Sequence, residues 1–267
     1  MPLWLDDLFL QTVDTLYALP RHAATPEQLR ACRIVSHRGE RDDRAVFENT
    51  CAAYDPLRGS GVFGIEFDVR WTQDLVPVVF HDPDLRRLHG DAARIRDLTW
   101  RELHERRPEI PDLASFVQRY AGEFHLMCEV KHERYPDPPL QSRRLAQALA
   151  PALERQRCTV LSLEPGMFGA LPDIPAAATM GVARLNTAAI SAEALAQRRA
   201  GFSAHYALID AATIAAHHAA GQTVGCGFPP SRALLYREAA RGVDFVFTDQ
   251  ARQLERWRRQ GADSLPA

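Results

Sequence analysis

The chain has 267 residues, of which 46% are hydrophobic and 25% are charged, and its formal net charge is −2. This length allows a large buried core in one or two domains. Because a near-zero net charge creates no long-range field for a polyanion, we expect no nucleic-acid partner.

The first twenty residues are apolar but contain Asp6, Asp7 and Asp14 and no basic start, so they do not resemble a secretory signal. No apolar run is long enough to span a bilayer, so we expect no transmembrane segment. Apolar residues from Leu5 to Tyr17 recur at helical spacing, which predicts an amphipathic helix within an extension over residues 1–31.

The five cysteines are widely spaced, odd in number and without a CxxC pair. This pattern argues against a disulfide framework or a zinc site and favours a reducing compartment, so we expect a cytoplasmic protein. The sequence makes no prediction of an oligomeric state.

Short apolar runs alternate with helical patterns, which predicts parallel strands joined by helical crossovers. The candidate strands are 33–36, 64–69, 76–80, 124–130, 159–163, 180–184, 206–210, 222–226 and 243–248. The candidate helices are 48–54, 100–105, 113–120, 139–153, 192–199, 213–220, 231–241 and 251–260. No linker or composition shift divides the chain, so we expect one domain over residues 1–267.

The predicted strands number one more than a (β/α)₈ barrel needs. We expect that either 180–184 or 206–210 is a loop or a short extra strand. The six residues 70–75 are too few for a helical crossover, so this link is either a hairpin or an extended return. The long segment 83–122 after the third strand reads as an insertion over one end of the barrel.

Ionisable residues follow each of the first four candidate strands. These residues are His37-Arg38, Glu66 and Asp68, His81-Asp82, and Glu129 and Lys131. Because the carboxyl ends of parallel barrel strands meet at one mouth, we expect these side chains to converge there.

Glu66 and Asp68 are two residues apart on a strand, so their side chains share a face. If Glu129 converges with them, the three carboxylates repel one another unless a cation or protons neutralise them. An oxygen-only site suits one hard divalent ion, Mg²⁺ or Ca²⁺. Arg38 and Lys131 add the positive charge that holds a phosphate, and two histidines supply an acid and a base near neutral pH.

Each motif alone has an ordinary structural explanation. Gly39 after His37-Arg38 can simply form a turn, Glu-x-Asp can be a solvated strand edge, and Glu-x-Lys can be a surface pair worth little. Four such motifs in succession, each at a strand end, are hard to assign to chance.

Taken together, the motifs resemble those of the glycerophosphodiester phosphodiesterase family, over roughly residues 33–250. The matching segments are His37-Arg38-Gly39, Glu48-Asn49-Thr50, Glu66-Phe67-Asp68-Val69, Thr72-Gln73-Asp74, Pro77–Asp82, Glu129-Val130-Lys131, Ile110–Leu113, Ser162, Gly242–Asp244 and Thr248-Asp249.

The resemblance implies an α/β fold, a TIM (β/α)₈ barrel, with one divalent ion held by Glu66, Asp68 and Glu129. It implies His37 and His81 as the catalytic acid and base. It also implies that Arg38, Lys131 and Asn49 bind the substrate phosphate and that Glu48 lies near the metal. The implied reaction converts a small glycerophosphodiester into glycerol 3-phosphate and an alcohol, with a neighbouring hydroxyl attacking phosphorus and water then opening the cyclic product.

Three segments depart from the family pattern. The first loop, 40–47, is longer and more charged, and it ends in Phe47 rather than proline. The segment 225–228 stands where the family has Trp-Thr-Val-Asn, and in the family this Trp often lines the pocket for the alcohol. We therefore expect a reshaped alcohol pocket, in which the ring of Phe228 partly replaces the ring of the missing Trp. Residues 87–90 read Arg-Leu-His-Gly instead of Arg-Thr-Thr-Gly.

Three alternatives stay open. The first is a lysophospholipase-D-like enzyme that takes a lysolipid phosphodiester, which a broad apolar groove near Phe228 would favour. The second is a metal-dependent sugar isomerase or aldolase barrel, which needs neither His-Arg-Gly nor His-Asp. The third is a barrel that binds without turnover, which the retention of every acid, base and metal position disfavours.

Overall fold

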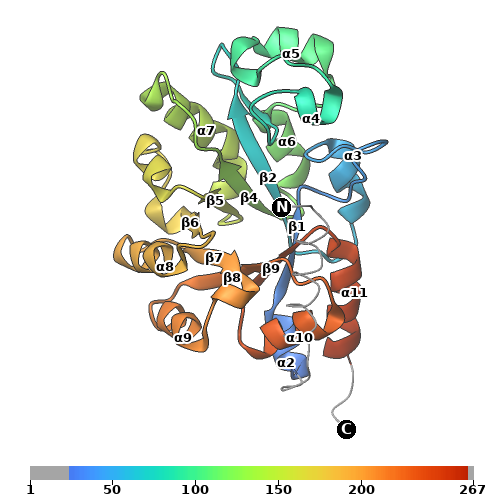
Figure 1. Cartoon of the computed structure of the whole chain (residues 1–267), viewed down its shortest axis with the longest axis vertical. Coiled ribbons are helices and arrows are strands. Elements are labelled where there is room, and N and C mark those ends of the chain that lie inside the picture. Colours follow the sequence, from blue (N-terminus) through green and yellow to red (C-terminus); the bar gives the residue numbers. More distant parts are fainter. Residues whose placement is uncertain (1–23, 264–267) are drawn as a thin grey trace, which may run out of the picture.

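Eight parallel strands close into a barrel in the computed structural model, which describes residues 24–263 (Figure 1). The strands are β1 (Arg33–His37), β2 (Gly64–Trp71), β4 (His125–Val130), β5 (Cys158–Ser162), β6 (Thr179–Val182), β7 (Gly201–His205), β8 (Thr223–Gly227) and β9 (Phe245–Thr248). β1 pairs with both β2 and β9, which closes the ring. The predicted TIM barrel is confirmed. The helix predicted near Leu5–Tyr17 lies outside the described residues.

The extra strand is β3 (Pro77–Val79), which pairs antiparallel with β2, so the link 70–75 is the hairpin. The expectation that either 180–184 or 206–210 is a loop is confirmed for 206–210, where residues 206–208 form a 3₁₀ turn, whereas 180–184 overlaps β6. The seventh barrel strand, β7, precedes this turn and was not among the predicted strands. A Cβ at Gly201 would lie 1.8 Å from the carbonyl oxygen of Thr223, so glycine is needed for β7 to approach β8.

The hairpin changes how His81 reaches the mouth. β2 continues past its last pairing with β4 at Val69, and β3 then runs back along its Arg70 and Trp71. The backbone N–H of Phe80 donates to the carbonyl oxygen of Asp68 at 2.9 Å, so the next residue, His81, lies beside the carboxylates. His81 therefore lies at the mouth, as expected, but it follows β3, an antiparallel strand that is not part of the barrel wall.

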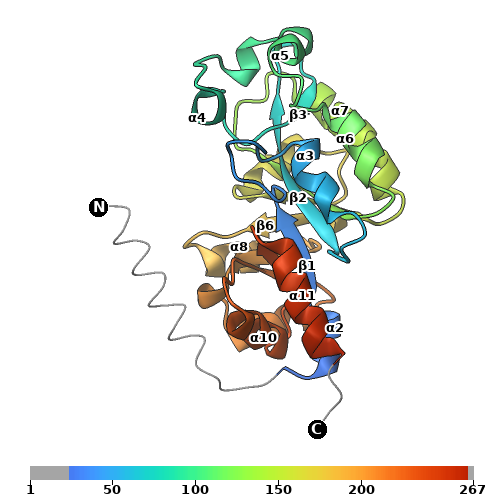
Figure 2. The ribbon, with the colours of Figure 1, turned by 90° about the vertical axis from the view of Figure 1, so that its right-hand side faces the viewer.

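Helices surround the barrel and support the loops at its mouth (Figures 1 and 2). They are α2 (Pro26–Ala31), α3 (Cys51–Tyr54), α4 (Arg86–His89), α5 (Trp100–Arg106), α6 (Leu113–Tyr120), α7 (Pro138–Leu153), α8 (Thr187–Ala196), α9 (Ala211–Ala219), α10 (Arg232–Ala240) and α11 (Ala251–Ala262). α4 and α5 lie beyond the tip of β2, whereas α6 packs against α7. Among the residues described, no helix is long and apolar enough to cross a membrane.

Two separate apolar clusters lie near the mouth, one inside the barrel and one within the segment that carries α4 and α5. The barrel interior is filled by Val35, Met127, Leu161, Met180, Phe245 and Phe247. The segment with α4 and α5 has a small core of its own, made of Val78, Phe80, Leu85, Ile95, Leu98, Leu103 and Ile110. Burial of these side chains stabilises both the barrel interior and the segment that carries α4 and α5.

Candidate active site

Three buried carboxylates form the centre of the site. Glu66 and Asp68 lie on β2, and Glu129 is paired in register with Asp68 on β4. One carboxylate oxygen from each residue lies within 4.8 Å of the other two. The strand spacing and the parallel register therefore produce the convergence that the sequence predicted.

The charges of this cluster are only partly balanced by the protein. Burial and the nearby charges of Asp68 and Glu129 raise the pKa of Glu66 well above its usual value. Both carboxylate oxygens of Glu66 are buried without a hydrogen-bond partner among residues 24–263. Burial also opposes ionisation of Asp68, but Lys131 and Arg38 lower its pKa. A buried carboxylate without a partner is costly, so the oxygen-only donor set fits a hard divalent cation.

Two basic side chains approach the carboxylates from one side. Arg38 Nε lies 3.0 Å from Asp68 Oδ2. Lys131 Nζ lies 2.5 Å from Asp68 Oδ1 and also pairs with Glu129. The structure thus brings Arg38 and Lys131, two of the three predicted phosphate-binding residues, into the site, where they contact the carboxylates directly.

Asn49 is held against Asp68 by an unusual backbone conformation. The predicted helix 48–54 begins later, at Cys51, because Asn49 has a φ of 61° and Thr50 is the N-cap. The Asn49 amide donates to Asp68 Oδ2 at 2.8 Å, and its Oδ1 accepts from the Tyr54 hydroxyl at 3.1 Å. Asn49 therefore orients a carboxylate, and Tyr54 is a supporting residue that the sequence analysis missed.

Glu48 lies among arginines rather than in the carboxylate cluster. Its carboxylate is 3.4 Å from both Arg38 and Arg41 and also pairs with Arg87. The side chain is only 3% exposed, so these partners offset the cost of burying its charge.

The two histidines flank the carboxylates, and each is hydrogen-bonded to an aspartate. His37 Nε2 is 3.9 Å from Glu66 Oε2, and its Nδ1 is 2.7 Å from Asp249 Oδ1. His81 Nδ1 is 2.7 Å from Asp82 Oδ1. Burial, together with Lys131 and Arg38, lowers the pKa of His81 and so favours the neutral ring, the form that accepts a proton.

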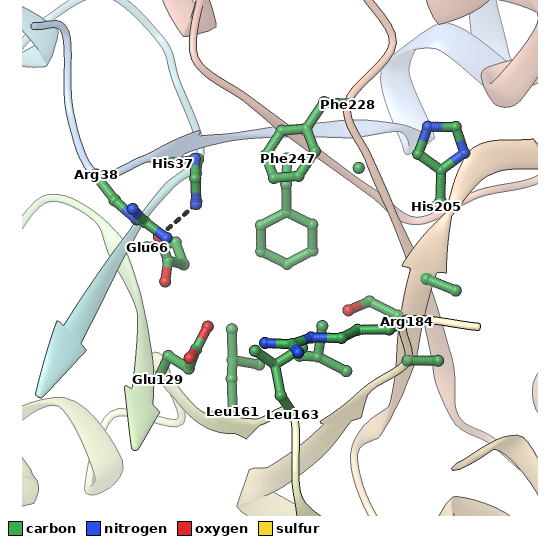
Figure 3. A pocket seen from close by; sticks show the side chains of 15 residues that line it. His37, Arg38, Glu66, Glu129, Leu161, Leu163, Arg184, His205, Phe228 and Phe247 are labelled. Atoms are coloured by element: carbon green, nitrogen blue, oxygen red, sulfur yellow. Dashed lines mark ion pairs between the residues drawn. The ribbon is translucent and has the colours of Figure 1, made fainter. Parts of the chain in front are cut away.

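A cavity of about 320 Å³ opens beside this cluster (Figure 3). Its charged wall is made by His37, Arg38, Glu66 and Glu129, and its apolar wall by Leu161, Leu163, Val182, Ala183, Ala204, Phe228 and Phe247. Arg184 and His205 lie on the far side from Glu66. The Phe228 ring meets the His37 ring edge to face, with centroids 4.7 Å apart. The structure therefore places Phe228 in the cavity, next to a predicted catalytic residue.

Fold and site together define a class of protein: a TIM barrel whose C-terminal mouth carries a carboxylate triad and two imidazoles. Residues 37–164 match the sequence model of the glycerophosphoryl diester phosphodiesterase family. The matched region contains every predicted metal, histidine and phosphate-binding residue. The resemblance inferred from the motifs is therefore confirmed.

Similar curated proteins include the glycerophosphodiester phosphodiesterase of Caldanaerobacter subterraneus, 34% identical over 90 residues, which are 34% of this chain and 35% of that protein. Rat glycerophosphodiester phosphodiesterase 1 is 35% identical over 86 residues, 29% of this chain and 25% of the relative. The chain thus spans about a quarter to a third of the length of these relatives.

Solved structures share the fold over most of the chain. A putative glycerophosphoryl diester phosphodiesterase from Silicibacter pomeroyi gives a TM-score of 0.70 at 20% identity, covering 93% of this chain and 98% of that one. An Oleispira antarctica phosphodiesterase in complex with the product sn-glycerol-3-phosphate gives 0.68 at 20% identity, covering 87% and 97%.

Proposed function

We propose that this chain is a metal-dependent phosphodiester hydrolase that cleaves glycerophosphodiesters to glycerol 3-phosphate and an alcohol. One observation carries the proposal: within a cluster of three acidic side chains, the buried carboxylate of Glu66 accepts no hydrogen bond among residues 24–263. The family match and the product complex of the Oleispira relative support diester chemistry over the sugar chemistry of an isomerase or aldolase. A cytoplasmic location suits the five free thiols, four of which are buried.

Glu66, Asp68 and Glu129 would hold one Mg²⁺ or Ca²⁺ ion, with no distinction between the two in the donor set. The bound ion supplies positive charge that polarises a phosphoryl oxygen. Arg38 and Lys131 hold the remaining phosphate charge, and Asn49 fixes the orientation of Asp68. Preorganised charges of this kind stabilise a transition state without reorganising.

The two imidazoles move the protons. One histidine takes the proton of the glycerol hydroxyl beside the phosphoester while that oxygen attacks phosphorus. The other gives a proton to the oxygen of the leaving alcohol. Water then opens the cyclic product with the two roles exchanged. In each ring Nδ1 is bound to an aspartate, so Nε2 is the nitrogen available to the substrate.

The direct test is an assay of purified protein with glycerophosphocholine and glycerophosphoethanolamine, with Mg²⁺ or Ca²⁺ and with EDTA. We expect release of choline or ethanolamine that EDTA abolishes and either ion restores. Absence of metal-dependent release from every diester would refute the proposal.

A second candidate, a lysophospholipase-D-like activity, is favoured by apolar side chains around the mouth. Among the described residues the exposed large hydrophobics are Leu185, Leu208 and Phe228, which follow β6, β7 and β8, and Leu185 is 91% exposed. Together with the apolar cavity wall, they would receive an acyl chain.

Choline release from lysophosphatidylcholine, compared with glycerophosphocholine, tests this candidate. We expect Leu185→Ser to lower the lysolipid rate several-fold and to leave the glycerophosphocholine rate unchanged. Equal effects on both substrates would reject a lipid-binding role for this rim.

A further inference from the structure

The same three-residue arrangement stands behind each of the two histidines. Behind His37, Asp249 Oδ1 lies 2.7 Å from Nδ1 and 2.9 Å from Arg41 Nη2. Behind His81, Asp82 Oδ1 lies 2.7 Å from Nδ1, and Asp82 Oδ2 accepts from Arg87 Nε at 2.6 Å. In both cases an aspartate contacts the imidazole, and an arginine contacts that aspartate.

The two series meet at a single carboxylate, that of Glu48. Its Oε2 lies 3.4 Å from Arg41 Nε, and its Oε1 pairs with Arg87 Nη2. An unbroken series of alternating charges therefore joins the two imidazoles. Glu48 is almost fully buried, so loss of either arginine would raise the cost of burying its charge.

Arg41 belongs to the loop 40–47, the segment that departs from the family pattern. Its Nη1 donates to the carbonyl oxygens of His37 at 2.7 Å and Gly39 at 3.2 Å, and its side chain is only 14% exposed. The backbone N–H of Glu48 donates to Asp43 Oδ1 at 3.0 Å. The unusual length and charge of this loop thus serve to place Arg41 and Glu48 together.

We propose that Asp249 and Asp82 are positioning residues that keep the proton of each imidazole on Nδ1, and that Glu48 holds both aspartates in place through Arg41 and Arg87. An aspartate that accepts from Nδ1–H fixes both the tautomer and the orientation of the ring. With the proton held on Nδ1 in both rings, each neutral ring has an unprotonated Nε2. This suits a reaction in which the two rings exchange roles between its steps, so the kinetic part of the proposal rests on the proposed function.

Nitrogen NMR of the histidine side chains tests the tautomers without any turnover. Spectra of the Mg²⁺-loaded protein would be recorded at a pH where the rings are neutral, with His37→Gln and His81→Gln for assignment. We expect Asp249→Ala to remove the Nδ1–H preference of His37 only, Asp82→Ala that of His81 only, and Glu48→Gln to alter both. Unchanged tautomers in the two alanine variants would overturn the proposal.

A remote histidine–aspartate pair offers a matched control. His218 Nε2 lies 2.9 Å from Asp244 Oδ2, on the ends of α9 and β9 away from the mouth. Asp244→Ala should change the signal of His218 and leave His37, His81 and turnover as they are. Altered signals of His37 in this variant would mean that aspartate loss perturbs histidines generally, which would also overturn the proposal.

Kinetics separate positioning from a merely structural role. We expect Asp249→Ala and Asp82→Ala each to lower kcat roughly 100-fold with KM nearly unchanged. Adding Asp82→Ala to His81→Ala should cost less than twofold more, because Asp82 acts through the ring that is already gone. If kcat of the double variant fell by the product of the two single-variant factors, the proposal would be overturned. An inactive wild type would instead refute the proposed function, and the tautomers alone would then decide the present inference.

Discussion

The mouth of the barrel has two unlike halves. The strands β1 to β4 end in the charged residues of the site, whereas β5 to β9 contribute mostly the apolar cavity wall, including Leu161, Val182 and Phe247. The family match covers residues 37–164 and thus ends just after β5. The charged half carries most of the family's motifs, and the apolar half contains the departure at 225–228. We therefore expect substitutions in the charged half to affect mainly the proposed chemistry and substitutions in the apolar half to affect mainly the choice of substrate.

The largest effect is expected in the charged half, from His81→Ala. Loss of a general acid or base costs about 10³-fold in kcat, and the fold should survive because His81 follows a strand outside the barrel wall. Steady-state kinetics and circular dichroism check both parts. His104→Ala, an exposed histidine on α5, is the control that should retain activity. Wild-type turnover by the His81 variant would remove this residue from the mechanism.

A smaller effect is expected from Lys131→Ala, which removes a cation from the proposed phosphate-binding position. The loss of one charge-assisted hydrogen bond corresponds to a rise in KM of about 10- to 100-fold. Arg134→Ala, an exposed cation three residues further on, should leave KM unchanged. An unchanged KM in the Lys131 variant, measured with the divalent ion saturating, would contradict its assignment.

Glu66→Gln should stabilise the metal-free protein at neutral pH. Because the folded pKa of Glu66 is raised, its contribution to stability is present below the unfolded pKa and is lost as the pH rises through the folded pKa. The neutral glutamine removes that loss, which we expect to be about 1–2 kcal/mol. Urea unfolding in EDTA from pH 5 to 8 measures it, with the exposed Glu154→Gln as control. A less stable Glu66 variant at pH 7 would contradict the proposed charge imbalance.

The smallest effect is expected in the apolar half, from Phe228→Ala. This ring is 44% exposed, so its loss should change the preference between apolar and polar leaving alcohols by several-fold, corresponding to about 1 kcal/mol. The ratio of kcat/KM for two diesters that differ only in the alcohol gives the result. An equal loss for both alcohols would mean that Phe228 supports His37 instead of contacting the alcohol.

The sequence predicted those parts of the fold in which apolar runs are long and strand ends carry charge. β7 was missed because Gly201, Ser203 and Ala204 give little strand signal, whereas the apolar run that follows is a 3₁₀ turn. The direction of β3 was left open, because the short link 70–75 permitted either a hairpin or an extended return.

The convergence of the three carboxylates could be predicted, because Glu66 and Asp68 are two residues apart on one strand and Glu129 lies on a parallel strand of the same barrel. The residues behind the histidines could not. Arg41 and Asp249 are 208 positions apart, and only closure of the barrel between β1 and β9 brings them together. Tyr54 was missed because its hydroxyl donates to Asn49, whose positive φ the sequence analysis did not foresee.

The β2–β3 ribbon has a consequence for engineering. β2 already has both of its barrel neighbours, β1 and β4, so β3 adds nothing to closure of the wall. One imidazole therefore follows a strand outside the barrel wall, whereas the proposed ion-binding carboxylates lie on the wall itself. Exchange of the ribbon and its small apolar core as a unit would place a different side chain beside an unchanged carboxylate cluster.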